Sequence, residues 1–332
     1  ITDAKNCTKT VSAEITEPVE LTIADAGLST AIACFGDNGQ IRVDITGDSN
    51  GPSPSKTSGG TSGVYKYDLY QGNSVFKTTS TNNLNHTFSA PAGTYKVRVT
   101  DVNGCFKETA DITLTQPNAP LALSGTKTDV SCNGAADGSI NLSVSGGTAN
   151  YTFAWTKTGD GSYSATTEDL NNLAPGTYNV TVTDANDCTE TISFTITQPD
   201  QLVATGTTSN KNGFGISCNG AADGSINLSV SGGTANYTFA WTKTGDNSYG
   251  ATTEDLSNLG PGTYNVTVTD ANDCTTTASF TITEPVELTI ADAGLSTAIA
   301  CYGDDGQIRV NITGDSNGNG SNQNYVYTLT GT

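Results

Sequence analysis

Apolar and polar residues alternate over short stretches along the whole chain, which is the pattern of half-buried β-strands. The stretch 118–199 shows it most clearly. Strands are predicted there at residues 121–130, 139–145, 151–156, 177–183 and 189–197, with short edge strands within 159–173. Clusters of Gly, Asp and Asn at 133–138 and 184–187 predict tight turns. Because no long stretch has apolar residues at helical spacing, the sequence predicts an all-β protein.

About seven short strands in roughly 85 residues, with a turn every 8–12 residues, predict an immunoglobulin-like β-sandwich. A tryptophan on the third predicted strand alternates with polar neighbours, so we expect it in the core. The pattern Leu-x-Pro-Gly-Thr-Tyr before the sixth strand resembles the tyrosine corner of such folds. The predicted core aromatic residues, with their copies along the chain, are Trp155, Trp241, Tyr95, Tyr178 and Tyr264.

The chain repeats itself. Residues 132–199 and 218–285 align without a gap and differ only where the first copy has positions 161, 164, 171, 174, 190, 192 and 198. The stretch that starts at Glu17 recurs from Glu284. The predicted domains are 1–18, the tail of a preceding repeat; 19–117, a repeat with a loop insertion at 50–63; 118–199; 200–285; and 286–332, the first part of a further repeat.

The joints between repeats are short. Each complete repeat ends in Gln-Pro or Glu-Pro, and the next strand begins a few residues later. Proline cannot donate to a strand ladder, so it marks the end of the last strand. We therefore expect the sandwiches to stack end to end as an elongated rod in which each repeat touches only its neighbours. Since both ends of the sequence cut through repeats, we also expect it to be a segment of a longer protein.

Composition excludes several classes of function. The formal net charge of −19 argues against a nucleic-acid partner, and no apolar run is long enough to cross a membrane. The single histidine, His86, lies in a stretch that recurs in no other repeat, so we expect it on the surface. The adjacent carboxylates Glu168 and Asp169, copied at Glu254 and Asp255, would point to opposite faces of a strand, so they do not predict a hydrolytic pair. We expect no enzyme activity.

The eight cysteines occur in pairs, one after the first strand and one after the sixth strand of each repeat. Such regular pairs in small domains suggest disulfides and an oxidising, extracellular compartment, whereas zinc would need clustered ligands. Pairing within a repeat would give Cys34–Cys105, Cys132–Cys188 and Cys218–Cys274. The two turns lie at opposite ends of a sandwich, about 25 Å apart, whereas a disulfide needs Cα atoms within about 7 Å. We therefore favour pairing between neighbouring repeats, Cys34–Cys188 and Cys132–Cys274, with free thiols as a further alternative.

Acidic turns accompany both cysteines. Stacked repeats would bring these turns together, and carboxylate oxygens at a junction suit Ca²⁺. The candidate ligands are Asp137, Asp184, Asp187, Asp223, Asp270 and Asp273. Aspartate is also ordinary turn chemistry, and no Asp-x-Asp-x-Asp-Gly loop is present. We therefore expect no cofactor, with Ca²⁺ as the alternative.

A family resemblance rests on these motifs. The series C-N-G-x-x-D-G-S-I-x-L-x-V-x-G-G-T, Y-T-F-A-W, P-G-T-Y-x-V-T-V-T-D-A-N-x-C-T and T-I-T-x-P resembles the SprB repeat. The resemblance is strongest in the second and third repeats, whereas the first and fourth replace C-N-G-A-A-D-G-S and lack the tryptophan. It implies a giant cell-surface protein of the Bacteroidetes, like the gliding-motility adhesin that is exported by the type IX secretion system.

The favoured function is therefore a structural and adhesive segment of a long surface filament. Its expected partners are the neighbouring repeats, with a surface polysaccharide or an external substratum as possible binding targets. A second interpretation is an array of carbohydrate- or matrix-binding modules, for which Tyr163 and Tyr249 are the repeated candidate platforms. A third is the stalk of a secreted enzyme that lies outside this sequence.

Overall fold

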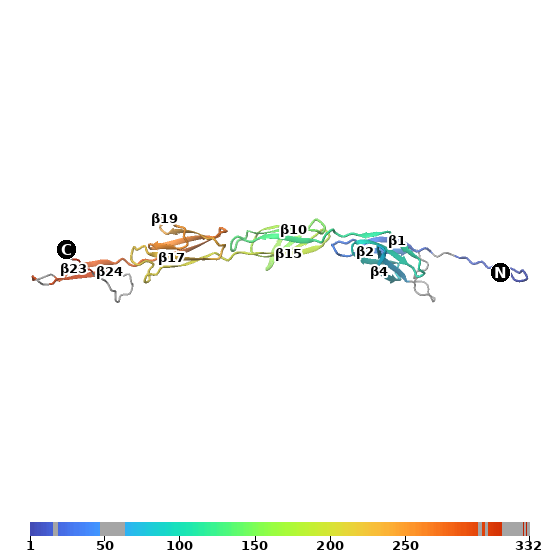
Figure 1. The fold of residues 1–332 in the computed structure, drawn as a ribbon, viewed down its shortest axis with the longest axis horizontal. Coiled ribbons are helices and arrows are strands. Elements are labelled where there is room, and N and C mark those ends of the chain that lie inside the picture. The colour runs from blue at the N-terminus through green and yellow to red at the C-terminus, as the bar shows by residue number, and fades with distance from the viewer. Residues whose placement is uncertain are drawn as a thin grey trace. The chain divides into compact units, whose positions relative to one another are not determined.

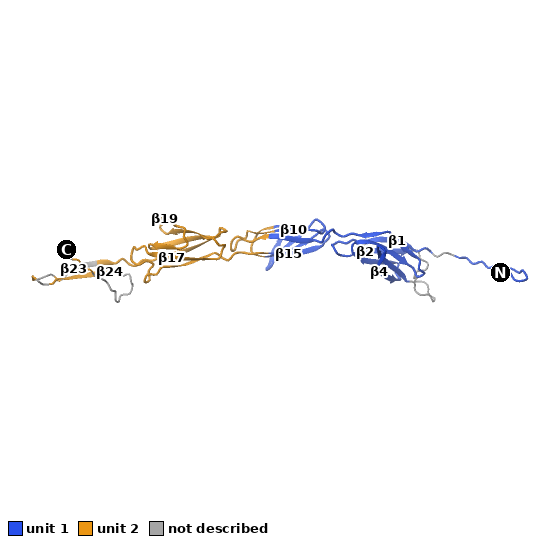
Figure 2. Cartoon of the chain, in the orientation of Figure 1, with its two compact units in different colours: residues 1–126, 141–169, 177–194 blue, residues 127–140, 170–176, 195–332 orange. Residues whose placement is uncertain are grey.

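The computed structural model describes residues 1–15, 19–46, 64–297, 301–302, 305–313, 328 and 330. The regular structure of these residues consists of β-strands without a helix, so no helix among them could cross a membrane. Figure 1 draws the strands as arrows, coloured along the chain from blue to red. The chain divides into two compact units (Figure 2). Unit 1 holds residues 1–126, 141–169 and 177–194, and unit 2 holds 127–140, 170–176 and 195–332.

The first sandwich lies within unit 1. Its strands are β1 (Thr22–Thr30), β2 (Gly39–Thr46), β3 (Tyr65–Gln71), β4 (Ser74–Thr81), β5 (Asn85–Ala90), β6 (Gly93–Thr100), β7 (Phe106–Glu108) and β8 (Ile112–Leu114). One sheet has the order β1-β2-β5, and the other has the order β4-β3-β6-β7, with β8 also paired to β6. In immunoglobulin nomenclature these are the A-B-E and C′-C-F-G sheets, with the last strand broken in two.

The alternation of side chains fixes which face of each sheet is buried. In β6, Tyr95, Val97 and Val99 point into the core, and each is at most 1 % exposed. They pack with residues of both sheets, among them Tyr67 and Leu69 of β3, in one apolar cluster. A sandwich needs such a shared core because each sheet has only one apolar face.

The second sandwich has the same strand order. Its strands are β9 (Ala122–Thr128), β10 (Gly138–Ser145), β11 (Thr152–Lys157), β12 (Asp160–Ala165), β13 (Leu170–Leu173), β14 (Gly176–Thr183) and β15 (Thr189–Ile196). The sheets run β13-β10-β9 and β12-β11-β14-β15. The boundary between the two units crosses this repeat: the pairing of β11 with β14 lies in unit 1, and that of β10 with β13 lies in unit 2.

The third sandwich lies within unit 2 and repeats the arrangement. Its strands are β16 (Val203–Thr208), β17 (Gly224–Ser231), β18 (Thr238–Lys243), β19 (Asp246–Ala251), β20 (Leu256–Leu259), β21 (Gly262–Thr269) and β22 (Thr275–Ile282). The sheets run β16-β17-β20 and β19-β18-β21-β22. Of the fourth repeat, the structure describes the pair β23 (Thr289–Thr297) and β24 (Gln307–Thr313). The expected insertion at 50–63 falls outside the described residues.

The predicted core aromatic residues are buried. Trp155, Tyr95 and Tyr178 are 1 % exposed, and Trp241 and Tyr264 are 2 % exposed. The hydroxyl groups of Tyr95 and Tyr264 donate to the backbone oxygens of Pro91 and Gly260, at 3.0 Å each. This bond to the carbonyl four residues upstream is the contact of a tyrosine corner. The prediction of an all-β protein built from immunoglobulin-like sandwiches is confirmed.

His86 differs from its expected place on the surface. It lies on β5, is only partly exposed, and packs edge-on against Phe88, with ring centroids 4.6 Å apart. It also contacts Tyr67, at 5.6 Å between centroids. Burial lowers the pKa of His86, because the charged form loses hydration. The sequence suggested a surface residue because His86 has no copy in other repeats, but it fills the edge of the first core.

Candidate functional site

The turn between strands F and G is built around one aspartate. In the third repeat, Asp270 Oδ1 accepts hydrogen bonds from the backbone N–H groups of Asn272 (2.8 Å) and Cys274 (2.9 Å). Its Oδ2 accepts a third bond, 2.8 Å long, from the N–H of Thr234 on the B–C loop. Asp184 makes the same three bonds in the second repeat. One buried carboxylate therefore fixes the position of the cysteine that follows it.

The same turn recurs at Asp3 and Asp101, whose Oδ1 atoms also accept from the N–H two and four residues later. The residue before the cysteine of each F–G turn has a left-handed backbone, which Gly, Asn and Asp tolerate best. These residues are Asn6 (φ 61°), Gly104 (φ 87°), Asp187 (φ 64°) and Asp273 (φ 63°). Asp187 and Asp273 thus serve backbone geometry.

The turn between strands A and B carries the other cysteine of each repeat, and residues far along the sequence hold it by hydrogen bonds. Gly134, two residues after Cys132, has φ 78°, and its N–H donates to Gln198 Oε1 at 2.9 Å. The side chain of Asn133 donates to the carbonyl of Pro199 at 3.0 Å. The corresponding glycine bonds run from Gly36 to Gln116 and from Gly220 to Glu284. The Gln-Pro or Glu-Pro pair that ends each repeat therefore also orders its A–B turn.

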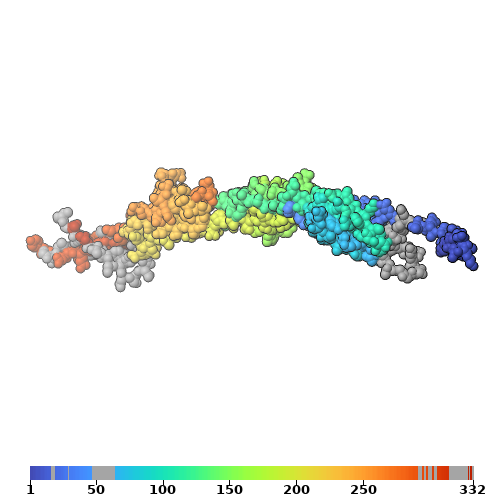
Figure 3. Space-filling view, turned by 45° about the vertical axis from the view of Figure 1, so that its right-hand side comes forward, coloured from blue at the N-terminus to red at the C-terminus, as the bar shows by residue number. Residues whose placement is uncertain are grey.

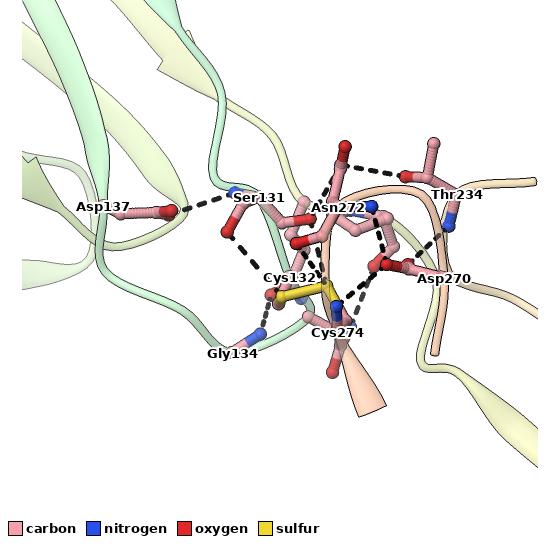
Figure 4. Close-up of a disulfide and its surroundings, with 11 residues drawn as sticks. Ser131, Cys132, Gly134, Asp137, Thr234, Asp270, Asn272 and Cys274 are labelled. Carbon is pink, nitrogen blue, oxygen red and sulfur yellow. Dashed lines mark hydrogen bonds between the residues drawn. A yellow bond between two sulfur atoms is a disulfide. The ribbon is translucent and has the colours of Figure 1, made fainter. Parts of the chain in front are cut away.

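Two disulfides connect neighbouring repeats. Cys34 of the first A–B turn is bonded to Cys188 of the second F–G turn, and both lie in unit 1. Cys132 of the second A–B turn is bonded to Cys274 of the third F–G turn, and both lie in unit 2. The Cα atoms are 5.7 Å apart in each pair, which is ordinary disulfide spacing. We call each linked pair of turns a junction, and Figure 4 shows the second one.

These are the pairs that the between-repeat alternative specifies. Cys34, Cys132, Cys188 and Cys274 are all used, so the within-repeat pairs are absent from the structure. Cys105 and Cys218, which two of those pairs would need, are free and exposed. Cys7 and Cys301 are also free and exposed. The second junction lies where the A–B turn of one repeat meets the F–G turn of the next.

One asparagine joins the two sides of each junction. The amide of Asn272 donates to the backbone oxygen of Ser131, just before Cys132, at 3.1 Å, and to Thr234 Oγ1 in its own repeat at 3.0 Å. Figure 4 shows Asn272 between these two groups. Asn186 makes the equivalent bond to the carbonyl of Ala33 at 3.1 Å. The pattern D-A-N-D-C therefore specifies a cap, a cross-junction donor and a disulfide partner.

The junction aspartates are kept ionised. Burial alone would raise the pKa of Asp270, but the backbone hydrogen bonds from Thr234, Cys274 and Asn272 outweigh it and lower the pKa. The pKa of Asp184 is lowered in the same way. Both side chains are 4 % exposed. Their carboxylate oxygens already face N–H donors.

The other candidate calcium ligands also have structural partners. Asp137 and Asp223 accept from the N–H groups of Ser131 and Ser217, at 3.0 Å each. Among the described residues, no group of three or more His, Cys, Asp or Glu side chains is placed to hold a metal ion. The Ca²⁺ alternative stays a prediction, and the structure brings no ligand cluster together to support it.

The remaining candidate residues have packing roles. Tyr163 lies edge-on against Tyr178, and Tyr249 against Tyr264, with ring centroids 5.2 Å apart in both pairs. They are therefore partly covered and do not form open flat platforms. Asp169 accepts from the N–H of Leu142 at 2.9 Å, and its copy Asp255 makes the equivalent bond. These carboxylates satisfy strand N–H groups.

A protein-family model matches two stretches of the chain that contain A–B turns of the kind described above. The model of the SprB repeat matches residues 124–160 and 216–245, which include the Cys132 and Cys218 turns. The chain therefore carries SprB repeats at these two stretches. A second model, the sperm-tail PG-rich repeat, matches residues 258–285, which hold the Pro-Gly-Thr-Tyr corner of the third SprB-type repeat. No curated protein matches the chain.

Several solved structures resemble the chain weakly. The three N-terminal domains of the highly immunogenic outer capsid protein of bacteriophage RB49 share 14 % identity over 80 % of this chain and 97 % of that one, with a TM-score of 0.34. A C-terminal 282-residue fragment of intimin, solved with the intimin-binding domain of its receptor, shares 15 % identity over 55 % and 66 %, with a TM-score of 0.33. Extracellular domains 3–5 of Drosophila OTK share 10 % over 79 % and 97 %, with a TM-score of 0.26. Because these TM-scores are low, the similarities carry no argument, and the fold is assigned from the strand order of the chain itself.

Proposed function

We propose that this SprB-repeat chain is a non-enzymatic structural and adhesive segment of a long bacterial cell-surface filament, of the kind used in surface attachment or gliding motility. The observation that carries the proposal is the covalent link between consecutive repeats. The first sandwich is joined to the second, and the second to the third, both by the chain itself and by a disulfide between the A–B and F–G turns. Two separate connections restrict bending and twisting more than one peptide joint does.

The peptide joints are short as well. Strand β8 ends at Leu114 and β9 begins at Ala122, while β15 ends at Ile196 and β16 begins at Val203. We infer that pulling on such an array loads the disulfides and short joints together. This suits a filament that must transmit force from a cell to a surface.

The disulfides also favour an extracellular place of work, because cytosolic thiols are kept reduced. The net charge of −19 suits an exposed and crowded filament, because like-charged neighbours repel one another. The free cysteines in matching turns, Cys105 and Cys218, suit further junctions with repeats of the same kind.

The experiment is to label intact cells of the source organism with an antibody raised against residues 118–285. We expect surface labelling, and we expect Fab fragments of the antibody to reduce attachment of the cells to a surface. A matched antibody against a cytosolic protein should do neither. An intracellular protein with all eight cysteines reduced would overturn the proposal.

A further inference from the structure

The outer face of the C′-C-F-G sheet of the first sandwich contains a buried carboxylate with an unused oxygen. Asp68 on β3 is 3 % exposed, and its Oδ1 atom is buried without a hydrogen-bond partner. The other oxygen, Oδ2, lies 2.8 Å from Lys66 Nζ. An unsatisfied buried carboxylate oxygen is costly, so its retention points to an external donor.

An ordered guanidinium lies beside this carboxylate. Arg98 is directly opposite Asp68 in the pairing of β3 with β6. Glu108 holds Arg98 through Nε at 2.8 Å and Nη2 at 2.6 Å. The guanidinium carbon also lies 5.2 Å from the ring centroid of Tyr70 and 4.4 Å from that of Phe106. Arg98 is thus fixed by a carboxylate and two rings, with N–H groups to spare.

The other sandwiches lack this set of residues. Aligning Leu69–Val97 with the pair Trp155–Val180 places Ala154 at the position of Asp68 and Thr181 at that of Arg98. The third repeat has Ala240 and Thr267 at these positions. Tyr70 and Phe106 are likewise replaced by Thr156 and Thr189 in the second repeat, and by Thr242 and Thr275 in the third. Since the fold does without these side chains twice, they are not needed for the sandwich.

The chemistry of the face identifies its ligand. Oδ1 of Asp68 has the capacity to accept a hydrogen bond from a hydroxyl, and the spare N–H groups of Arg98 have the capacity to donate to a second one. Phe106, which is 55 % exposed, offers an apolar surface. The charges on this face are neutralised in ion pairs. The pairs are Lys66–Asp68, Arg98–Glu108 and Lys96–Asp111. A ligand with little net charge and adjacent hydroxyl groups fits such a balanced face.

We propose that this face of the first sandwich, centred on Asp68, Arg98 and Phe106, is a binding site for a neutral polysaccharide. A pair of neighbouring sugar hydroxyls bridges Asp68 and Arg98, and the C–H face of the ring lies on Phe106. Lys66 Nζ lies on Oδ2, and the Lys66 side chain is 54 % exposed, so it can turn outward when the sugar reaches the carboxylate. A pocket of about 290 Å³ lined by Thr22, Ile23, Lys107 and Glu108 lies at the edge of the sheet next to β7 and provides room for a further sugar unit. Figure 3 shows the surface of the first sandwich in blue to turquoise.

The test uses the full chain and a panel of soluble polysaccharides: dextran, mannan and galactan as neutral probes, and alginate as an anionic one. Binding is measured by biolayer interferometry at low and high salt. We expect at least one neutral probe to bind, with an affinity that changes less than twofold with salt. D68N and F106A should each weaken that binding at least tenfold. Y249A, which removes an aromatic side chain from the third repeat, should leave it unchanged.

Circular dichroism shows whether D68N remains folded, and F106A, at an exposed position, provides an independent measure. The proposal is overturned if none of the neutral probes binds. Binding that survives both D68N and F106A also overturns it, since the site would then lie elsewhere. Binding restricted to alginate and lost at high salt would show simple charge attraction and likewise overturn it.

Discussion

The two disulfides overlap along the chain, which makes the length of the molecule under force a sensitive test of their pairing. From Cys34 a pulling force crosses to Cys188, returns through the chain to Cys132 and crosses again to Cys274. Only the stretch 132–188 then spans the distance between Cys34 and Cys274, instead of the whole stretch 34–274. At about 3.3–3.6 Å per extended residue, the fully unfolded span is roughly 200 Å with the disulfides and roughly 800 Å without them.

The assay is single-molecule force spectroscopy on the whole chain, held by handles at its two ends, before and after reduction with dithiothreitol. We expect reduction to lengthen the fully extended molecule by roughly 600 Å, because the two bridges then no longer bypass the chain. Pairing within repeats would give a similar length for the oxidised chain, since only the short stretches 105–132 and 188–218 would bear the force. A matched variant is needed to separate these alternatives.

The double variant C105S/C218S provides that separation. Both cysteines are free and exposed, so the oxidised variant should extend as far as the oxidised wild type. With pairing within repeats, the same variant would leave the longer stretches 34–132 and 188–274 to bear the force. It would then extend by roughly 400 Å more than the wild type, and that lengthening would refute the junctions.

Further predictions concern the turns that position the disulfides and the repeat cores. D270A should lower the free energy of unfolding by about 3–5 kcal/mol, because three partly buried N–H groups lose a charged acceptor. Denaturation followed by tryptophan fluorescence measures this loss, and a value below about 1 kcal/mol would contradict the prediction. The pKa values of Asp184 and Asp270 are lower in the folded state than in the unfolded state, so the ionised carboxylates stabilise the fold fully above about pH 4. This stabilisation is lost as the pH falls through the pKa values of the folded state. Thermal melts from about pH 7 to 2 should therefore show a smaller acid-induced loss of stability in D270A than in the wild type. G232A should lower the free energy of unfolding by at least about 2 kcal/mol more than G245A does. Both glycines have positive φ, but a Cβ at Gly232 would lie 1.9 Å from a backbone oxygen, whereas a Cβ at Gly245 would have no atom within 4 Å. Y264F should cost about 0.5–1.5 kcal/mol through the lost corner hydrogen bond, and an unchanged melting temperature would argue against that bond.

The sequence predicts the sandwich well because its information is local and repeated. Alternation along residues 177–183 places Tyr178, Val180 and Val182 on one face, and each is buried. Trp155 could be assigned to the core because its neighbours alternate on the same strand. The role of Asp169 could not be predicted in this way: its bond to the N–H of Leu142 depends on how two segments 27 residues apart meet.

At the junctions, the topology of the sandwich was a better guide to the cysteine pairing than the acidic composition of the turns was to a metal site. The distance between the ends of a sandwich favours pairing Cys34 with Cys188, although Cys105 belongs to the same repeat. The acidic turns suggested calcium because acidic residues in turns also occur in metal sites. The structure instead directs Asp184 and Asp270 at backbone N–H groups, a role that a sequence pattern alone does not distinguish from ligation.

The unusual face of the first sandwich was missed for a different reason. Asp68 and Arg98 are distant from each other in the sequence, and only the pairing of β3 with β6 places them opposite each other. A signal was present in the alignment of repeats, since Asp68 and Arg98 replace the Ala154 and Thr181 of the second repeat. Comparing outward-facing positions between repeats would have revealed it.

The most direct test of the junctions is a disulfide map of the oxidised chain by mass spectrometry after digestion without reduction. The structure predicts peptides that link Cys34 to Cys188 and Cys132 to Cys274. Peptides that link Cys132 to Cys188, or Cys34 to Cys105, would contradict the account and would make each repeat a separately closed domain.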